Sequence, residues 1–352
     1  MAQNRALTEK RLSALWSDPN VPELSTRGNK YVIISDTHLG DGGEADDFRE
    51  NEKALERALA HYAKNDYTLI LLGDVEEFWQ FDLDRIEKRY RDSIYAGIKA
   101  FGDERVHRVY GNHDSEWGNP SDPAKNDPNG RKGAPEALKL RDVSEQTSLL
   151  LVHGHQGSTD ADKYSWFSRF VVRGLFKPVE AAAKWLGLYG HPAATKSQVT
   201  KDYENIFYAW AKANKVIVIC GHSHRAIFAS QSYADELQEK IESMQAGIIT
   251  TRMAVDAIKA EVKKIEKLRQ ELADEKNKGR DFQPLEANGR ALPCYFNSGC
   301  ALYTDGLTAI EIANDAIKLV KWHKKAGQEP PVIVFKEGRL SAFIKKVKEN
   351  ES

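Results

Sequence analysis

The feature that most constrains the fold is a short β-branched apolar run that ends in glycine and polar residues and recurs along the chain. It occurs five times, in residues 30–36, 67–74, 105–114, 147–155 and 215–224. Helical stretches such as 47–64 and 82–101 lie between the runs, and strands that alternate with helices are typical of an α/β fold. Sites in such folds gather at the carboxyl ends of the strands. We therefore expect the polar ends of these strands to meet at one place.

The polar ends supply carboxylate, imidazole and amide groups. They hold Asp36 and His38 in "DTH", Asp74 in "GD", Asn112, His113 and Asp114 in "GNHD", His153 and His155 in "HGH", and His222 and His224 in "GHSH". Oxygen and nitrogen donors without thiolate suit Mn, Fe, Zn or Ni rather than a structural cysteine-ligated zinc site. A spacing of two residues places both side chains on the same side of an extended segment, so the pairs in "DTH" and "GHSH" can each face one site. His155 is the ambiguous member, since it lies in the motif and can also face away.

Charge and composition exclude several classes of function. The 51 Lys and Arg residues balance 52 Asp and Glu residues, so no strongly basic field favours nucleic acid. Three cysteines are too few for a disulfide framework and fit a reducing cytosol. The polar N-terminal stretch has no signal-peptide core, and no apolar run approaches the roughly 20 residues that span a bilayer. We expect a cytoplasmic protein that is soluble or attached to a membrane surface.

The chain divides into a core with two interruptions. We expect an N-terminal helical extension (1–29), a core (30–231 and 291–335) that contains a helical cap (157–213), a charged helical hairpin insertion (232–290) and a basic C-terminal tail (336–352). Apolar residues three and four apart in the insertion indicate helices that pack along a seam. The insertion lies between two expected strands, 226–230 and 292–297. If they pair, the chain must return to where it left, so two helices are favoured over one. A later β-hairpin should turn at Asn314 and Asp315.

The order of these motifs resembles the calcineurin-like metallophosphoesterase superfamily. The family pattern is D-x-H, GD-x-x-D/E, GNH-D/E, a histidine after a strand, and GH-x-H, and the match spans residues 31–224. The resemblance implies a four-layer αββα sandwich with two divalent metal ions between its sheets. To this fold we add the helical cap and the helical hairpin insertion.

The resemblance also implies a role for each motif residue. The first metal ion would be held by Asp36, His38 and His224, and the second by Asn112, His153 and His222, with Asp74 bridging them. Two such ions polarise phosphoryl oxygens and lower the pKa of a bridging water, whose hydroxide would attack phosphorus in line. His113 would stabilise charge or act as a general acid near the leaving group, and Asp114 would orient it. Mn is the expected metal, with Fe, Zn and Ni as alternatives.

A closer resemblance is to the UDP-diacylglucosamine pyrophosphohydrolase branch of the lipid A pathway. It rests on "GDVEEFW", "HGHQGSTDADKYSWFSRFVVR" and "GHSHRA". The implied substrate-binding residues are Glu77, Trp79, Asp160, Tyr164 and Arg225, and the arginine could meet a phosphate as a fork-shaped donor. The chain departs from the branch in "GNHD" for GNRD, "HGH" for HGD, the missing proline after "GHSHR" and the long insertion. The branch therefore supports the chemistry and a capped site.

Two helical segments each allow two interpretations. Residues 164–189 mix aromatic and basic side chains, as in a lid for an acyl chain or a peripheral membrane contact. A cap that packs on the sandwich is favoured instead. Residues 232–279 are either a self-contained hairpin or an arm that forms a homodimer or binds a partner, and the interaction role is favoured.

The function expected from these features is hydrolysis of a phosphodiester or pyrophosphate bond by a dinuclear metal site. A phosphorylated small molecule or lipid-linked substrate of the UDP-sugar type is favoured. The alternatives are a nucleotide or nucleic-acid phosphodiesterase and a protein phosphatase. A further alternative is a scaffold without enzyme activity that works through the helical arm.

Overall fold

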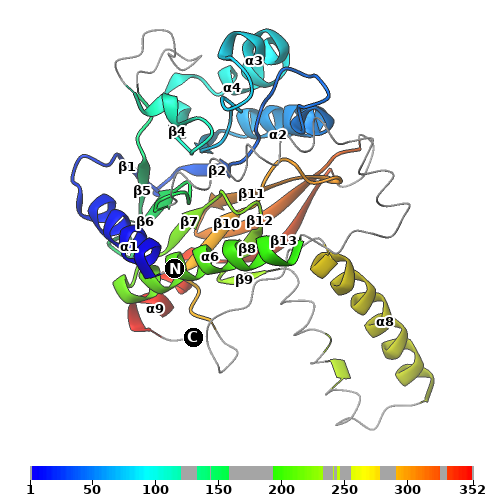
Figure 1. Ribbon diagram of the computed structural model, residues 1–352. Coiled ribbons are helices and arrows are strands. Elements are labelled where there is room, and N and C mark those ends of the chain that lie inside the picture. The colour runs from blue at the N-terminus through cyan, green and yellow to red at the C-terminus, as the bar shows by residue number, and fades with distance from the viewer. Residues whose placement is uncertain are drawn as a thin grey trace.

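The computed structural model describes residues 2–119, 133–142, 144–157, 193–232, 241, 244–245, 255–277, 291–325 and 331–350. Two β-sheets face each other, and helices cover the outer face of each (Figure 1). This arrangement of helices, sheet, sheet and helices confirms the expected α/β sandwich. Within the described ranges, no helix has both the length and the apolar character that a membrane crossing requires.

Both sheets are mixed. The seven-stranded sheet has the order β1 (Glu23–Ser25), β5 (Ala137–Asp142), β6 (Thr147–Val152), β7 (Val218–Cys220), β10 (Tyr295–Ser298), β8 (Ala226–Phe228) and β9 (Gln231–Ser232). The six-stranded sheet has the order β13 (Val332–Arg339), β12 (Ala316–His323), β11 (Gly306–Ala313), β2 (Lys30–Ile34), β3 (Tyr67–Leu72) and β4 (Val106–Val109). Strands β2, β3 and β4 are parallel, as are β6, β7 and β10. The polar motifs of each sheet therefore follow strands that end at a common edge.

Helices pack on the strand faces that the sequence makes apolar. Those on the six-stranded sheet are α2 (Glu52–Lys64), α3 (Leu83–Tyr90) and α4 (Ala96–Lys99), with a π-helical turn, Arg91–Tyr95, joining the last two. In β2, Val32 and Ile34 pack with these helices, whereas Tyr31 and Ile33 belong to the core between the sheets. This alternation is the side-chain period of a strand buried on both faces. Short 3-10 segments are Phe48–Asn51, Asp103–Arg105 and Ser115–Gly118.

Two further helices cover the seven-stranded sheet. They are α1 (Ala2–Ser17) and α6 (Ala193–Asn214), which lie side by side at the lower left of Figure 1. The indole N–H of Trp210 in α6 donates to the Ser13 hydroxyl of α1 at 2.9 Å. Leu12 and Leu15 of α1 belong to the same buried core as the seven-stranded sheet. The N-terminal helix is therefore part of the sandwich.

Two expected strand contacts are confirmed. Strands β8 and β10 pair antiparallel, with Asn297 opposite Ile227, so the chain returns after the insertion to the strand at which it left. Strands β11 and β12 form the expected hairpin, in which Asn314 and Asp315 have φ of 50° and 64°. Positive φ at both central residues defines the turn type that matches strand twist.

The C-terminal segment corrects the sequence analysis. Residues 336–352 were expected to be a basic tail, but β13 continues to Arg339 and α9 (Leu340–Glu349) follows it. Leu340, Ile344 and Val347 of α9 are buried in the main core. Their spacing of four and three residues makes one apolar helix face, while the lysines occupy the remaining surface. Strands β1 and β5 are additional elements that the sequence analysis did not predict.

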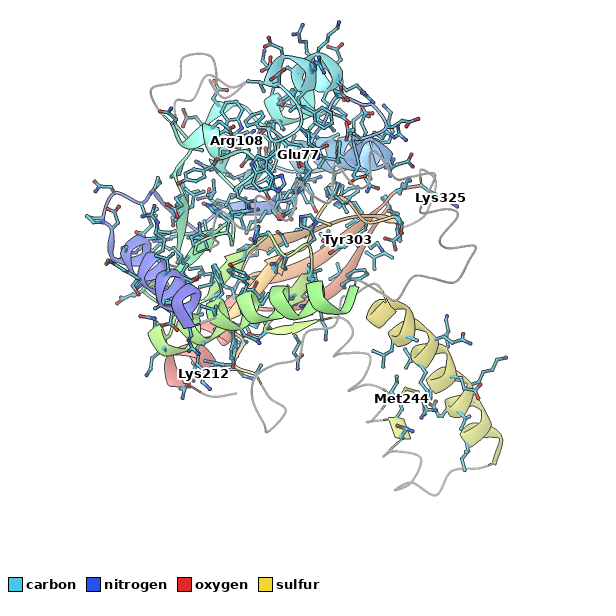
Figure 2. All side chains as sticks on the ribbon, viewed as in Figure 1. Glu77, Arg108, Lys212, Met244, Tyr303 and Lys325 are labelled. Atoms are coloured by element: carbon cyan, nitrogen blue, oxygen red, sulfur yellow. The ribbon has the colours of Figure 1, made fainter. Side chains whose placement is uncertain are left out.

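The insertion forms a small apolar cluster of its own. Helix α8 (Val255–Asn277) extends away from the sandwich (Figure 1), and Met244 lies beside it in Figure 2. Ile241 and Met244 belong to one cluster with Ile265, Leu268 and Leu272 of α8. The hairpin and its pairing role stay predictions, since most of the segment before α8 lies outside the described residues. The same holds for residues 158–192 of the expected cap.

Candidate metal centre

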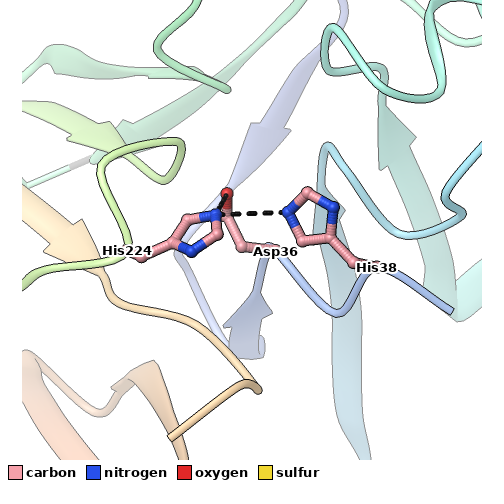
Figure 3. Close-up of side chains that lie close together, drawn as sticks. All are labelled: Asp36, His38 and His224. Atoms are coloured by element: carbon pink, nitrogen blue, oxygen red, sulfur yellow. Dashed lines mark hydrogen bonds and ion pairs between the residues drawn. The ribbon is translucent and has the colours of Figure 1, made fainter. Parts of the chain in front are cut away.

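The expected metal-binding side chains come together where the strands end. Asp36, His38 and His224 form one cluster, whose ligand atoms all lie within 4.8 Å of one another (Figure 3). A second cluster meets the same distance limit and contains Asp74, His153 and His222. The first joins motifs that follow β2 and β7, from different sheets, and the second joins motifs that follow β3, β6 and β7. The site therefore lies across the edge where the two sheets meet.

The backbone at these residues is left-handed. The φ angles are 52° at Asp36, 47° at His38, 51° at Asp74, 65° at His222 and 57° at His224. This conformation costs a residue with a Cβ about 1–2 kcal/mol, and such strain is characteristic of functional sites. The pairs in "DTH" and "GHSH" were expected on extended segments because of their spacing of two residues. The positive φ angles correct this expectation. Each strand has ended, and a sharp turn directs the side chain.

The first cluster is tightly packed. His224 Nε2 lies 3.2 Å from both Asp36 Oδ1 and His38 Nε2. The buried Asp36 carboxylate also accepts hydrogen bonds from the His222 backbone N–H, at 3.0 and 2.9 Å. The Tyr303 hydroxyl donates to the His224 carbonyl at 2.8 Å. The loops after β2 and β7 are thereby held together at the site.

Asp74 belongs to the second cluster and also faces the first. Its Oδ2 is 3.0 Å from His153 Nε2 and 3.8 Å from His38 Nε2. Its Oδ1 accepts a hydrogen bond from the His113 backbone N–H at 2.8 Å. One carboxylate oxygen thus faces an imidazole nitrogen from each cluster, and the other is anchored to the loop after β4.

The His38 and His153 rings are each hydrogen-bonded through the nitrogen that points away from the site, which fixes the other nitrogen toward it. His38 Nδ1 lies 2.9 Å from Glu77 Oε2, and His153 Nδ1 lies 2.9 Å from the Leu72 carbonyl. Both partners are acceptors, so each ring donates a proton from Nδ1 and directs its Nε2 atom into the site. A metal ion held through Nε2 would need this arrangement, in which Nδ1 donates to an acceptor on the far side of the ring.

The charges of the site fit divalent cations. Among the residues that the structure describes, Asp36 and Asp74 form ion pairs with imidazoles alone. Burial opposes their ionisation, yet the neighbouring imidazoles lower the pKa of both carboxyls. Burial would also lower the pKa of His153, but the two carboxylates raise it to about 10. The Asn112 Oδ1 atom is buried without a hydrogen-bond partner, and an amide oxygen of this kind can serve a hard or borderline cation.

Glu77 and Trp79 contact the site's histidines. Glu77 is 4% exposed. Its carboxylate is hydrogen-bonded to His113 Nδ1 at 2.8 Å as well as to His38 Nδ1. The Trp79 ring stacks on the His113 ring, with centroids 3.8 Å apart. Both were expected to bind substrate. Both contact His113, and Glu77 also contacts His38, so they orient these rings, while their expected substrate contacts stay a prediction. The sequence signal for the orienting role of Glu77 was an acid three residues after Asp74.

Asp114 does not orient His113, which corrects the role expected for it. Its carboxylate accepts hydrogen bonds from the backbone N–H groups of Val75 (2.8 Å) and Gly111 (2.6 Å). Burial raises the pKa of Asp114 to about 7, with a further contribution from the charge of Asp74. The residue joins the loops after β3 and β4.

A buried ion pair supports the same two loops. Glu76 is fully buried and accepts hydrogen bonds from the two terminal nitrogens of Arg108, at 2.5 and 3.1 Å. The Trp117 indole (2.8 Å) and the Tyr95 hydroxyl (3.0 Å) also donate to it. Arg108 lies 3.7 Å from Asp114. The network connects β4 with the segment between Asp74 and Glu77.

The remaining substrate-binding expectations receive no structural support. Arg225 is 4% exposed, and its guanidinium pairs with Glu204 of α6 at 2.6 Å. This buried contact holds the loop after β7 against α6, and the role of Arg225 as a phosphate contact stays a prediction. Asp160 and Tyr164 lie outside the described residues. His155 is packed near the Tyr110 and His153 rings and belongs to neither cluster.

Replacing Gly111 with alanine is expected to disrupt the site. A Cβ there would lie 2.1 Å from Asp74 Oδ1 and 2.6 Å from the Asp74 backbone nitrogen. Overpacking of this kind costs about 1–3 kcal/mol, and here it displaces the Asp74 carboxylate. We expect Mn²⁺ binding, measured by calorimetry, to weaken about tenfold or more. The control is Gly43→Ala, at an exposed position whose Cβ would meet only the half-buried Asp41 side chain. Equal Mn²⁺ affinity in the two variants would contradict the prediction.

The sandwich and its paired carboxylate–imidazole clusters define a metal-dependent phosphoesterase. The family model of calcineurin-like phosphoesterases matches residues 30–226, which is more than half of the chain. This chain belongs to the calcineurin-like phosphoesterases, and it is a metal-dependent phosphoester hydrolase.

Comparison with individual proteins adds little to the family assignment. A conserved uncharacterized protein from Streptococcus pneumoniae, described as a predicted phosphoesterase, is similar to 87% of this chain over 97% of its own. The identity is 12% and the TM-score is 0.30, so the likeness carries no argument about this chain. No curated protein is similar enough to this sequence to count as a match.

Proposed function

We propose that this protein uses two divalent metal ions to hydrolyse a phosphodiester or pyrophosphate bond. The position of Asp74 Oδ2, between His153 Nε2 and His38 Nε2, carries the proposal. Asp36, His38 and His224 would hold one ion, and Asn112, His153 and His222 the other, with Asp74 serving both. Ions bound there polarise phosphoryl oxygens and lower the pKa of a bound water. Mn²⁺ is the proposed metal.

The proposed role of His113 follows from its surroundings. Glu77 holds its Nδ1 and Trp79 covers one face of its ring. The ring is thereby fixed in one orientation beside Asp74, whose Oδ1 receives the His113 backbone N–H. In that orientation Nε2 can donate a proton to a phosphoryl or leaving-group oxygen. Glu77 balances the charge of the ring while it carries two protons.

The proposed substrate is a phosphorylated small molecule of the UDP-sugar or UDP-lipid class, acted on in the cytoplasm. The sequence likeness of "GDVEEFW" and "GHSHRA" to the UDP-diacylglucosamine pyrophosphohydrolase branch supports this choice. Residues 157–213 are proposed to cap the site, and residues 232–279 to form a homodimer contact. The near balance of charge does not favour a nucleic-acid substrate.

A substrate panel with Mn²⁺ present tests the proposed function. We expect hydrolysis of bis-p-nitrophenyl phosphate and release of UMP from UDP-sugars or UDP-lipids. A chelator should abolish both activities, and added Mn²⁺ should restore them. The panel includes nucleotides, DNA and a phosphopeptide as the alternative substrates. Metal-loaded protein that hydrolyses none of the panel would contradict the proposed chemistry, and activity on the phosphopeptide or DNA alone would contradict the substrate class.

A further inference from the structure

Glu136 lies directly before β5 and connects to the loop after β4. Its carboxylate accepts a hydrogen bond from the Tyr110 hydroxyl at 3.2 Å. Tyr110 is two residues before Asn112, and its backbone N–H donates to the Pro135 carbonyl at 3.3 Å. The segment that ends in Glu136 is thus bound to this loop through a side chain and through the backbone.

The same carboxylate connects to the loop after β6 through Gln156. The Gln156 amide nitrogen donates to Glu136 at 3.4 Å, and its amide oxygen accepts the Gly154 backbone N–H at 3.1 Å. The Gln156 amide has one donor end and one acceptor end. With its nitrogen directed at Glu136, its oxygen faces Gly154, the residue after His153. Gln156 is 2% exposed, so this orientation is held within the protein. Glu136 therefore contacts two of the three loops that carry proposed ligands of the second ion, those after β4 and β6.

Helix α1 supplies the third partner of this carboxylate. Arg11 donates to Glu136 from Nε at 3.0 Å and also from a terminal nitrogen. The helix also rests on the loop after β6, since a Cβ at Gly157 would lie 2.0 Å from the Thr8 hydroxyl. Thr8 is fully buried. Helix α1 precedes residues 30–226, the part that matches the family, so one side of these contacts comes from outside the matched residues.

We propose that Glu136, held by Arg11, is a positioning residue for the second metal ion. The proposal rests on the proposed function, which assigns Asn112 and His153 to that ion. All three groups around the carboxylate are donors, so only acceptor atoms satisfy them. A carboxamide at this position would turn one acceptor into a donor and remove the charge-assisted bond to Arg11. The loops that carry Asn112 and His153 would then lose their common anchor.

The test is a Co²⁺ titration of Glu136→Gln, followed by calorimetry and by the ligand-field absorption of the bound ion. We expect the first binding step to stay within about twofold of wild type and the second to weaken about 10–100-fold. Tyr110→Phe removes one donor and keeps the carboxylate, so it should weaken the same step by less. A purely structural loss would weaken both steps together, which the absorption bands of the two sites distinguish.

The matched control is Glu311→Gln on the six-stranded sheet. Glu311 accepts a hydrogen bond from the Tyr62 hydroxyl at 2.6 Å, and this variant should bind both ions as wild type does. Unchanged binding steps in folded Glu136→Gln, or equal weakening of both steps, would overturn the inference alone. A wild-type protein that binds a single ion would overturn the proposed function together with the inference.

Discussion

The Asp74→Asn variant is expected to lose about 10³-fold or more of kcat toward bis-p-nitrophenyl phosphate with Mn²⁺, which corresponds to about 4 kcal/mol of barrier. The change removes one negative charge at the oxygen that faces His153 at 3.0 Å and His38 at 3.8 Å. Asparagine keeps the size of the side chain and tolerates positive φ, so the fold should persist. The measurements are kcat and metal content per protein.

The control for this variant is Asp66→Asn. Asp66 has a φ of 60°, close to the 51° of Asp74, but its side chain is 86% exposed at the protein surface. The two variants therefore share the chemical change and the backbone conformation, and only one is at the metal centre. Asp66→Asn should keep wild-type kcat. Folded Asp74→Asn protein with full activity would rule out the proposed role of this carboxylate.

The Arg108→Met variant is expected to lower the free energy of unfolding by about 3–5 kcal/mol. Removing the guanidinium leaves the Glu76 carboxylate buried and without its two strongest donors, which lie at 2.5 and 3.1 Å. Methionine fills part of the space of the arginine side chain. The lower free energy of unfolding is therefore due more to the uncompensated Glu76 charge than to a cavity. Urea denaturation followed by circular dichroism measures the effect. We also expect weaker Mn²⁺ binding, because Glu76 lies between Asp74 and Glu77.

Arg105→Met is the control for Arg108→Met. It distinguishes the effect of leaving a buried charge unpaired from the loss of an ion pair at the surface. Arg105 lies 3.6 Å from Asp66, whose side chain is 86% exposed, and it also donates to the Tyr67 carbonyl at 3.3 Å. Exposed pairs contribute about 0–1 kcal/mol, so this variant should unfold near the wild-type urea concentration. If both arginine variants have the same stability, the buried network does not hold the loops as described.

The meeting of the polar motifs could be predicted from the sequence because each motif directly follows a buried strand. Once β2, β3, β6 and β7 form, the residues after them have little freedom, and Asp36 and His222 are brought to the same edge. The α/β class could be predicted because apolar runs and amphipathic stretches alternate along the chain, whereas the sandwich was implied by the resemblance to the calcineurin-like superfamily. The structure confirms both the layers and the pairing of β8 with β10.

The roles of Glu77 and Asp114 could not be predicted in the same way. Asp114 is next to His113 in sequence, and that proximity favoured it as the orienting group. The contact goes to Glu77 because the loop after β3 turns its acid toward both His113 and His38, while the backbone of Asp114 turns its carboxylate to Val75. Side-chain direction in a turn depends on φ and ψ, which local sequence does not determine.

The C-terminal elements were missed for a different reason. Residues 336–352 carry many lysines, so charge dominated the interpretation. The large apolar residues of α9 are Leu340, Phe343, Ile344 and Val347, on one face of a ten-residue helix. Their importance appears only when Phe343 is seen against Phe228 and Phe296 of the seven-stranded sheet. Long-range packing of this kind has no signature in a short window of sequence.

The position of β10 has a consequence for the order in which the protein matures during synthesis. This strand, residues 295–298, lies between β7 and β8, and the Asn297 amide donates to the Gly221 carbonyl (2.6 Å) and the Ser223 hydroxyl (3.1 Å). The "GHSH" loop therefore lacks its support until some seventy residues after His224 have left the ribosome. Contacts so distant along the chain form slowly. A nascent chain that already contains all the metal-binding side chains therefore still lacks an assembled metal centre. A metal ion that bound at this stage would contact imidazoles that are not yet in their final positions.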